Sequence, residues 1–473
     1  MVFSSILFLF CFLPLFLISY HIVATRYKNI VLLIFSLVFY AWGAPEFIFL
    51  LLGSLTINFY VVQAIYNNHR RKKLFVYISL IINIGLLAYF KYANFFIENV
   101  NAILSQLNIT NVGWTQIVLP IGISFFTFQS LTYTIDVYRN VHKPLDKLHD
   151  YLLYILMFPQ LIAGPIVRFN TVADDIVDRE KNDTIDNKSY GITTFVIGLS
   201  KKVLIANVLG EFVDTTFSNS ISEASSGLLW LTIIAYSFQI YFDFSGYSDM
   251  AIGLGRMIGF RFPENFNNPY ISQNITEFWR RWHITLSEWM KDYLYIPLGG
   301  NRVSSVYRLY FNLIVVFLIS GFWHGANWTF IVWGAWHGLF LILDRVFLIK
   351  IMKSCGKVPR IIITYIIVLI GWVFFRADNF SQSIEYIQGM FSFNSLNIGQ
   401  DLSEEFLVVL FIAIVFSFSG ITHIGKQMQN VLYAEKRSRK GRAVMFVTAF
   451  VFLILSASYI TASGFNPFIY FRF

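Results

Sequence analysis

Charged residues and cysteine are both scarce in this chain, and each scarcity narrows what the protein can be. Charged residues make up 13% of the 473 residues and hydrophobic residues 56%, and the mean hydropathy is +0.60. A soluble domain carries about 25% charged residues, so that class is excluded. The two cysteines, Cys11 and Cys355, have no partners at metal-ligand or disulfide spacing. The composition therefore predicts a multi-pass membrane protein.

Familiar nucleotide-binding and hydrolase motifs are also absent. The chain has no P-loop, no dinucleotide-binding glycine fingerprint and no G-x-S-x-G nucleophile elbow. The net charge of +9 would suit nucleic-acid binding. The basic residues lie in short loops between apolar runs, however, where the positive-inside rule already accounts for them. We therefore expect membrane lipids as partners and no nucleic acid.

The apolar runs are long enough to cross a bilayer, which takes about 20 residues of helix. They predict an all-α polytopic fold, a single integral-membrane domain over 1–473 with its core at 119–345. The opening run lacks a basic start and a small-residue cleavage site, so we expect a retained helix rather than a signal peptide. About twelve spans are predicted, at 3–20, 29–43, 46–66, 74–92, 119–136, 190–210, 226–244, 305–322, 326–343, 361–375, 406–424 and 444–462.

Loop charge predicts the orientation. The most basic loops are 70–73, 345–360 and 426–442, and all three fall on one side when the spans are counted in order. Short basic loops stay in the cytoplasm. We therefore expect a bacterial inner-membrane protein with both termini extracytoplasmic, including the C-terminal tail 463–473.

The segment 151–169 is broken by Pro159, Gly164 and Pro165 and is too short to cross cleanly. Non-helical backbone at membrane depth must be buried in protein or line a wet cavity. We predict a re-entrant hairpin with Gln160 and Arg168 near a cavity. A surface loop bounding one ordinary helix is the alternative.

Charges inside spans should face the interior or reach the interface. Lys201 and Lys202 interrupt the sixth span, and Asp243 and Asp249 lie near the end of the seventh. We expect the two carboxylates to pair with Arg256 or Arg261, or to cap a helix, rather than to catalyse.

Most of the concentrated polar chemistry lies between residues 263 and 338, where tryptophan and histidine alternate at short spacing. Apolar residues recur at helical spacing from 275 to 295, which predicts one amphipathic helix at the membrane, with His283 beside its aromatic face. Four asparagines precede it, and an apolar setting would penalise unpaired amides. The candidate substrate-binding residues here are Asn267, Asn268, Arg280, Arg281 and Trp282.

His324 lies at the junction of two spans, close to Asn327, a further binding candidate. A titratable group at membrane depth indicates function, and imidazole suits general-base work at neutral pH. His337 is thirteen residues further on, roughly 220° around an ideal helix, so we expect it to face away and to hydrogen-bond between helices. No cysteine lies nearby, and no histidine or carboxylate lies three or four residues after His324. The sequence therefore does not support a zinc site there.

Four ordered stretches resemble the membrane-bound O-acyltransferases, and within them the bacterial branch that O-acetylates exported polysaccharides. The likeness spans nearly the whole chain. Its motifs are FPQLIAGPIVRF, YFDFSGYSDMAIGLGRMIGFRFPENFNNPY, FWRRWHITLSEWMKDYLYIPLGGNR and GFWHGANWTFIVWGAWHG.

The resemblance implies helices around a funnel, with the family histidine at His324 and a second site histidine at His283. It implies an acyl donor from the cytoplasm, usually acetyl-CoA, no bound cofactor, and a partner acetyltransferase outside that modifies the polymer. Arg280 and Arg281 would meet the donor phosphates, or else lipid headgroups. The terminal FIYFRF resembles a motif whose tyrosine carries the acyl group, which would make Tyr470 a relay; an aromatic anchor is the alternative.

On this basis His324 would act as the base, with His283 or nearby amides steadying the oxyanion. Two other functions stay open: D-alanyl transfer to teichoic acid from a carrier-protein thioester, and polysaccharide or lipid transport. The chain shows no repeat in corresponding halves of the kind found in many transporters, and a non-catalytic scaffold would not need histidine at that depth.

Overall fold

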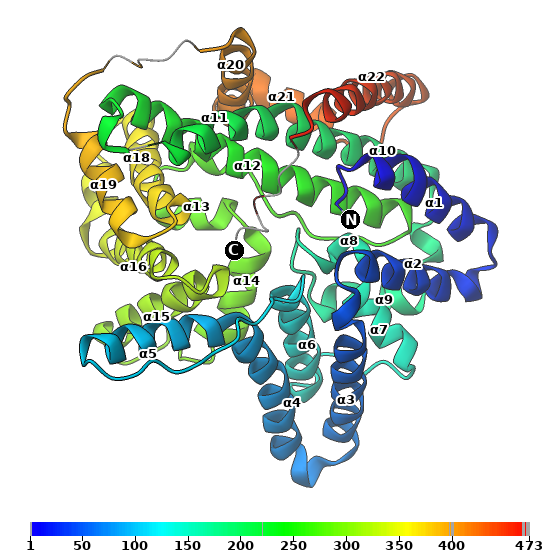
Figure 1. Ribbon diagram of the computed structural model, residues 1–473. Coiled ribbons are helices and arrows are strands. Elements are labelled where there is room, and N and C mark those ends of the chain that lie inside the picture. The colour runs from blue at the N-terminus through cyan, green and yellow to red at the C-terminus, as the bar shows by residue number, and fades with distance from the viewer. Residues whose placement is uncertain (1, 220, 397, 399–401, 466–468, 470–473) are drawn as a thin grey trace. The chain divides into compact units, whose positions relative to one another are not determined.

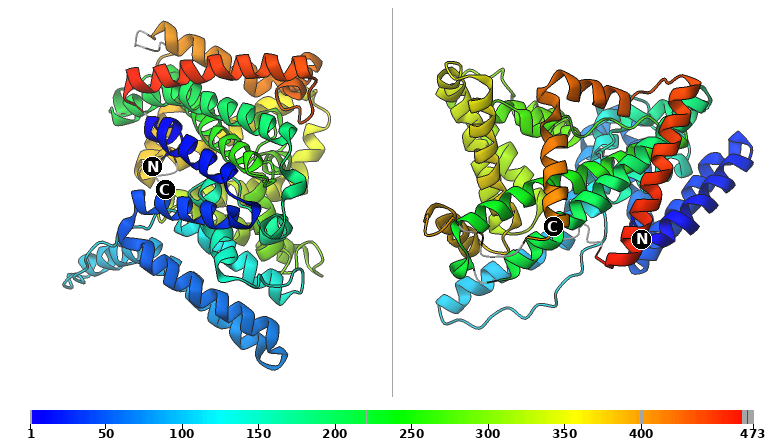
Figure 2. Two further views of the ribbon diagram at one scale, coloured as in Figure 1. Left: turned by 90° about the vertical axis from the view of Figure 1, so that its right-hand side faces the viewer. Right: turned by 90° about the horizontal axis from the view of Figure 1, so that it is seen from above.

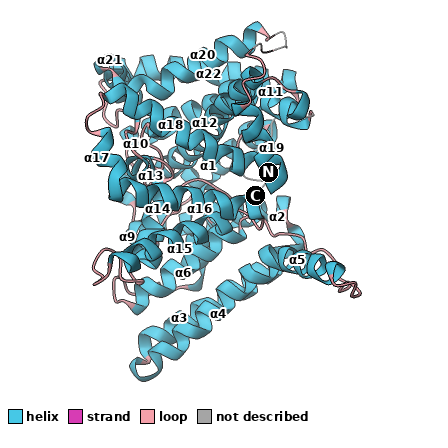
Figure 3. Ribbon diagram, turned by 90° about the vertical axis from the view of Figure 1, so that its left-hand side faces the viewer, coloured by secondary structure: helices cyan, strands magenta, loops and turns pink. Residues whose placement is uncertain are grey.

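A computed structural model describes residues 2–219, 221–396, 398, 402–465 and 469. Throughout these residues the secondary structure is helical, with no strand (Figure 3). The chain forms two compact units, each described separately below. Unit 1 contains Leu7–Asp183 and Ile258–Pro263, and unit 2 contains Phe3–Ile6, Thr184–Met257 and the described residues from Glu264 onward.

The predicted all-helical membrane fold is confirmed. Among the described residues, nine helical segments are long and apolar enough to cross a membrane: Pro45–Asn67, His69–Gln106, Ile185–Ser218, Ser226–Met257, Val306–His324, Trp328–Met352, Lys357–Arg376, Glu404–Ile421 and Arg439–Ser463. The other three predicted spans correspond to shorter helices, at Phe8–Ile22, Lys28–Gly43 and Ile123–Tyr138.

In unit 1, a hairpin of two long helices, α3 and α4, lies beside α6 (Figure 1). A buried polar network joins the three helices: the Ser79 hydroxyl and the Asn83 amide both donate to Asn58 Oδ1, at 2.6 and 3.0 Å, and the Ser79 hydroxyl lies 2.8 Å from the Thr134 hydroxyl of α6. The helices of unit 1 are α1 (Leu13–Ile22), α2 (Lys28–Gly43), α3 (Ile48–Asn67), α4 (Lys72–Leu87), α5 (Ala93–Gln106), α6 (Ile123–Tyr138), α7 (Leu148–Leu156), α8 (Phe158–Leu161) and α9 (Phe169–Val177).

The predicted re-entrant segment is a broken helix inside unit 1. Helix α7 ends at Leu156, the single turn α8 follows, and residues 162–168 are non-helical before α9 begins. Every residue from 153 to 167 is buried, so the segment is not a surface loop. Gly122 lies against it at φ +78°, where an added Cβ would come within 2.7 Å of the Leu161 carbonyl oxygen. Burial in protein satisfies the requirement for non-helical backbone at membrane depth.

Unit 2 is built on the close crossing of α10 and α12, with α22 lying along α10 (Figure 2). A Cβ on Gly198 would lie 2.4 Å from the Gly246 carbonyl oxygen, and one on Gly253 would lie 2.6 Å from that of Gly191. Only glycine permits so close an approach. The helices of unit 2 are α10 (Ile185–Ser200), α11 (Asn207–Ser218), α12 (Ser226–Met257), α13 (Ile275–Arg281), α14 (Ile284–Met290), α15 (Val306–His324), α16 (Trp328–Leu343), α17 (Ile349–Met352), α18 (Lys357–Arg376), α19 (Phe380–Phe391), α20 (Glu404–Phe418), α21 (His423–Leu432) and α22 (Arg439–Ser463).

The intramembrane lysines and aspartates pair with one another, not with Arg256 or Arg261 as predicted. Between α10 and α11 the chain makes a π-helical turn, η7 (Lys201–Ala206). Lys201 lies 2.6 Å from Asp249, and Lys202 lies 2.5 Å from Asp243. The prediction assigned partners by nearness in sequence, whereas the glycine crossing brings the lysines of η7 against α12.

Candidate active site

His324 is positioned by a tight hairpin of α15 and α16. A Cβ on Gly321 would lie 2.1 Å from the Phe330 carbonyl oxygen, so the two helices touch backbone to backbone. His324 is the last residue of α15, and α16 starts after a three-residue turn whose Asn327 accepts from the Thr329 N–H at 3.1 Å. The turn therefore holds the imidazole over the first turns of α16.

Aromatic rings surround His324. Its ring centroid lies 5.0 Å from Trp323, 5.2 Å from Trp333 and 5.3 Å from Phe375, each edge to face. The histidine itself is half-buried. An imidazole enclosed in this way lies in a poorly hydrated setting, where polar interactions are stronger than in water.

The helix predicted from 275 to 295 is interrupted at His283, which is a correction to the sequence analysis. Helix α13 ends at Arg281, α14 begins at Ile284, and His283 between them has φ +43° in the left-handed region. A non-glycine residue held there costs about 1–3 kcal/mol and is common at functional sites. Hydrophobic periodicity missed the break because the apolar positions continue in register on both sides of it.

The side chain of Asn265 holds this break in place. Its Oδ1 accepts from the Thr285 hydroxyl at 2.9 Å and backbone N–H at 3.4 Å, and it lies 3.1 Å from His283 Nδ1. Its Nδ2 donates to Ser248 at 3.0 Å. Since a backbone N–H can only donate, the amide oxygen faces His283, so Nδ1 of His283 carries the proton. Its Nε2 is then a bare acceptor, and no described residue bonds to it.

His283 and His324 form the candidate catalytic pair. Their ring centroids lie 6.4 Å apart. Hydrogen bonds span about 2.7–3.0 Å between heavy atoms, so this separation suits one oxygen held between the rings. Burial lowers the pKa of His283 to about 3, which keeps it neutral at physiological pH. The structure thus brings together the two histidines singled out in the sequence.

His337 does not face away from the site, as the helical angle predicted. Its ring lies 5.1 Å from Trp333 and 5.0 Å from Trp279. The angle argument assumed one continuous helix, but the break after His324 resets the geometry. Neither ring nitrogen of His337 has a hydrogen-bond partner among the described residues, so the predicted interhelical hydrogen bond is also wrong.

The buried indole N–H groups of Trp279 and Trp333, which belong to this cluster, have no hydrogen-bond partner among the described residues. Trp333 is 1% exposed and packs edge-on against His324. A buried donor without an acceptor is costly and invites a ligand or water oxygen. Trp279 and Trp333 received no role from the sequence, because spacing alone does not show where an indole nitrogen is buried.

A polar hollow of ≈ 580 Å³ opens beside α13. Arg280 is exposed on it and makes no ion pair with a described residue, whereas Arg281 pairs with Glu277 at 2.9 Å. Asn267 also lines the hollow, and its backbone carbonyl accepts from Arg281 at 3.1 Å. The predicted binding residues Asn267, Arg280 and Arg281 therefore share one surface.

Three other binding candidates are engaged within the protein. Asn268 exchanges amide hydrogen bonds with Gln429, at 2.9 and 2.7 Å. Asn327 caps α16 and donates to the Asp378 carbonyl at 3.0 Å. Trp282 is buried, with its ring centroid 4.8 Å from that of Trp372. Their side chains are engaged by these partners, so we assign them no direct contact with substrate.

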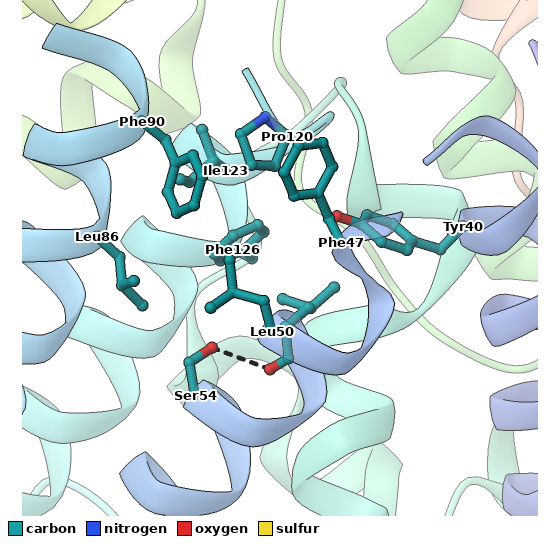
Figure 4. A pocket seen from close by; sticks show the side chains of 10 residues that line it. Tyr40, Phe47, Leu50, Ser54, Leu86, Phe90, Pro120, Ile123 and Phe126 are labelled. Atoms are coloured by element: carbon teal, nitrogen blue, oxygen red, sulfur yellow. Dashed lines mark hydrogen bonds between the residues drawn. The ribbon is translucent and has the colours of Figure 1, made fainter. Parts of the chain in front are cut away.

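The remaining candidates lie elsewhere in the chain. Gln160 is fully buried in unit 1 and donates to the Tyr154 carbonyl at 2.5 Å, while Arg168 precedes α9. Unit 1 also has a narrow apolar pocket around Phe47, Phe90 and Phe126 (Figure 4), but neither candidate lines it. Tyr470 lies outside the described residues. Among the described residues, no group of three His, Cys, Asp or Glu side chains could hold a metal.

Comparison with known proteins identifies the class of this protein. The sequence model of the membrane-bound O-acyltransferase family matches residues 139–382, a stretch that contains both candidate histidines, His283 and His324. The chain belongs to this family and is an acyltransferase.

Individual relatives indicate which branch of the family the chain is more similar to. The probable alginate O-acetylase AlgI of Azotobacter vinelandii is 40% identical over 100% of both chains. The peptidoglycan O-acetyltransferase of Helicobacter pylori is 39% identical over 84% of this chain and 81% of its own. The teichoic acid D-alanyltransferase of Streptococcus thermophilus is 29% identical and covers 56% of this chain. The two O-acetylating enzymes thus have a higher identity to this chain, and match more of its length, than the D-alanyltransferase.

Proposed function

We propose that this protein takes an acetyl group from a cytoplasmic thioester, acetyl-CoA, and passes it across the bacterial inner membrane for O-acetylation of an exported cell-envelope polysaccharide. The observation that carries the proposal is the His283–His324 pair, 6.4 Å apart in a buried aromatic setting, in a chain similar throughout its length to an alginate O-acetylase.

His324 is the general base. It takes the proton from the acceptor hydroxyl as the hydroxyl oxygen attacks the thioester carbonyl carbon. The C–O bond forms, the tetrahedral intermediate collapses, and the C–S bond breaks. The protonated His324 then returns the proton to the departing thiolate. His324 is the better placed of the two histidines for this cycle, because burial holds His283 neutral with its pKa at about 3.

The oxyanion needs hydrogen-bond donors, and the tautomer of His283 excludes it from that role. Its bare Nε2 can only accept, so it instead receives a hydrogen bond from a hydroxyl or water in the site. The buried N–H of Trp333, in edge contact with His324, supports assigning this indole as the donor. A donor already fixed in place costs no reorganisation as charge develops.

The polar hollow at α13 is the proposed donor entrance. Acetyl-CoA is an anion, and the exposed guanidinium of Arg280 supplies, at the edge of the hollow, a cation that forms no ion pair with a described residue. Arg281 is already neutralised in part by Glu277, so Arg280 is expected to carry more of the attraction for phosphate.

On the acceptor side, Tyr470 is proposed to receive the acetyl group and hand it to an extracytoplasmic acetyltransferase partner. Its phenol is a hydroxyl nucleophile of the kind that divides a transfer into two easier steps. Support comes from the likeness of the terminal residues to an acyl-carrying motif and from the charge-based orientation, which puts the tail outside.

The test is to incubate the purified full chain with radiolabelled acetyl-CoA, alongside His324→Ala and Tyr470→Phe variants, and to map the label kept on the protein. The proposal expects label on Tyr470 that His324→Ala abolishes while the variant remains folded. Label on another residue removes Tyr470 as the relay. Transfer from a D-alanyl carrier protein, with none from acetyl-CoA, would replace the acetyl proposal.

A further inference from the structure

The ion pair of Lys202 and Asp243 is more deeply buried than its neighbour. The side chains of Lys202 and Asp243 are 4% and 2% exposed, against 21% and 15% for Lys201 and Asp249. Removing two charges from water is costly, and their mutual attraction offsets the cost only when further hydrogen bonds complete the site. The groups that donate or accept these further hydrogen bonds therefore indicate what the Lys202–Asp243 pair does in the structure.

Those groups come from the C-terminal segment. The backbone N–H of Ile469 donates to Asp243 Oδ2 at 3.0 Å. Lys202 donates to Asn207 Oδ1 at 2.8 Å, and the Asn207 amide donates to the Phe465 carbonyl at 3.2 Å. Lys202, Asn207 and Asp243 thus hold the chain at two points four residues apart, and Ile469 itself is 8% exposed within the core of unit 2.

The neighbouring pair, Lys201 and Asp249, makes no such contact with the described C-terminal residues. Asp249 accepts from Lys201 and from the Tyr433 hydroxyl, at 2.6 and 2.8 Å, and Tyr433 lies at the end of α21. Both ion pairs join η7 to α12, so a pair that only braced these two elements would need no contact with the C-terminal segment. Contact with backbone groups of Phe465 and Ile469 distinguishes the Lys202–Asp243 pair and its neighbour Asn207.

We propose that Lys202, Asn207 and Asp243 form a C-terminal latch, a binding site within unit 2 for the Phe465 carbonyl and the Ile469 N–H. Because the latch bonds to a carbonyl and an N–H, it recognises these two backbone groups and makes no demand on side-chain identity. Its functional consequence rests on the proposed relay: the latch fixes the residue before Tyr470 and so acts as a positioning site for that phenol.

The test measures whether the segment leaves the core when the latch is removed. Ile469→Cys is placed in the full chain with Cys11 and Cys355 replaced by serine, and reaction with a maleimide is timed in detergent micelles. The latch is removed by the double variant Lys202→Met/Asp243→Leu, since an apolar pair of similar volume is often tolerated in place of a buried ion pair. The matched control is Lys201→Met/Asp249→Leu.

The latch variant is expected to label about tenfold faster or more, because Ile469 then opens locally, and the control should label like the parent. Asn207→Leu, which keeps the ion pair, should also speed labelling. Labelling of the latch variant at the parental rate, or equally fast labelling of the control, overturns the proposal. Thermal unfolding of each variant shows whether fast labelling reflects local release or loss of the fold.

A parallel acetylation assay separates this inference from the relay. If the latch variant labels fast and Tyr470→Phe abolishes acetylation, the latch variant should lose acetylation as well. Full activity of Tyr470→Phe would remove the relay while leaving the latch to stand on the labelling result alone.

Discussion

At the scale of single residues, the division of labour between two histidines follows from their hydrogen bonds. Asn265 fixes the tautomer of His283 and leaves Nε2 as an acceptor, while His324 is half-buried among aromatic rings. The sequence indicated both histidines, and the family resemblance suggested His324 as the base and His283 or nearby amides at the oxyanion, but neither reveals a tautomer. A tautomer depends on which atom faces which nitrogen, and spacing along the chain does not carry that information.

The first prediction concerns acid stability. Burial lowers the pKa of His283 to about 3, from about 6.5 in an unfolded chain. Between these values the unfolded state binds a proton that the folded state does not, so stability is fully present above about pH 6.5 and declines as the pH falls toward 3. The unfolding temperature of His283→Gln should therefore drop less between pH 7 and pH 5 than that of the parent. The exposed His69→Gln should behave like the parent; an equal drop in His283→Gln would contradict the buried neutral histidine.

The second prediction concerns the indole of Trp333. Trp333→Phe keeps an aromatic ring against His324 and removes only the N–H. If that N–H binds the oxyanion, kcat should fall by a factor on the order of 10²–10³, with little change in KM. Trp336→Phe on the same helix is the control, because its N–H already donates to the Ile367 carbonyl at 2.9 Å. Rates of acetyl transfer that are equal in the two variants would exclude Trp333 as the donor.

At the scale of elements, apolar length was enough to predict the helices, and proline and glycine predicted the break within 151–169, but other features were not predicted. Twelve predicted spans match helices of the structure to within several residues at most ends. The break at His283 and the partners of Lys201 and Lys202 were missed. Both depend on contacts between segments, the Asn265 clamp in one case and the glycine crossing of α10 and α12 in the other, and neither contact has a local signature.

The third prediction tests that crossing. A Cβ on Gly246 would lie 2.6 Å from the Gly198 carbonyl oxygen, so Gly246→Ala should force α10 and α12 apart. Overpacking of this kind costs about 1–3 kcal/mol. Thermal unfolding in detergent should show the loss. Gly53→Ala on α3 is the control, since nothing lies within 4 Å of its added Cβ. Equal stability of the two variants would mean that α10 and α12 can accommodate a methyl group at their crossing.

At the scale of the whole molecule, the proposed export of an acetyl group requires the donor and the acceptor to meet the protein from opposite sides. The distribution of basic residues among the loops predicts which side of the membrane each end of a span faces. Helix α22 is the sharpest place to test it, because it is a single span with Arg439, Lys440 and Arg442 in its first turn and only uncharged residues at its far end. Basic residues flanking a span are retained in the cytoplasm.

The fourth prediction is therefore that the two ends of α22 face different compartments. In a chain with Cys11 and Cys355 replaced by serine, Ser463→Cys should react with a membrane-impermeant maleimide on intact spheroplasts, and Lys440→Cys should react only after the membrane is opened. Both positions are exposed on the protein, so a difference in labelling reports the side of the membrane and not burial. The opposite pattern would place the chain after Ser463 in the cytoplasm. An acyl group on Tyr470 would then never leave the side of its donor, and the relay would fail on topology even if Tyr470 were acetylated.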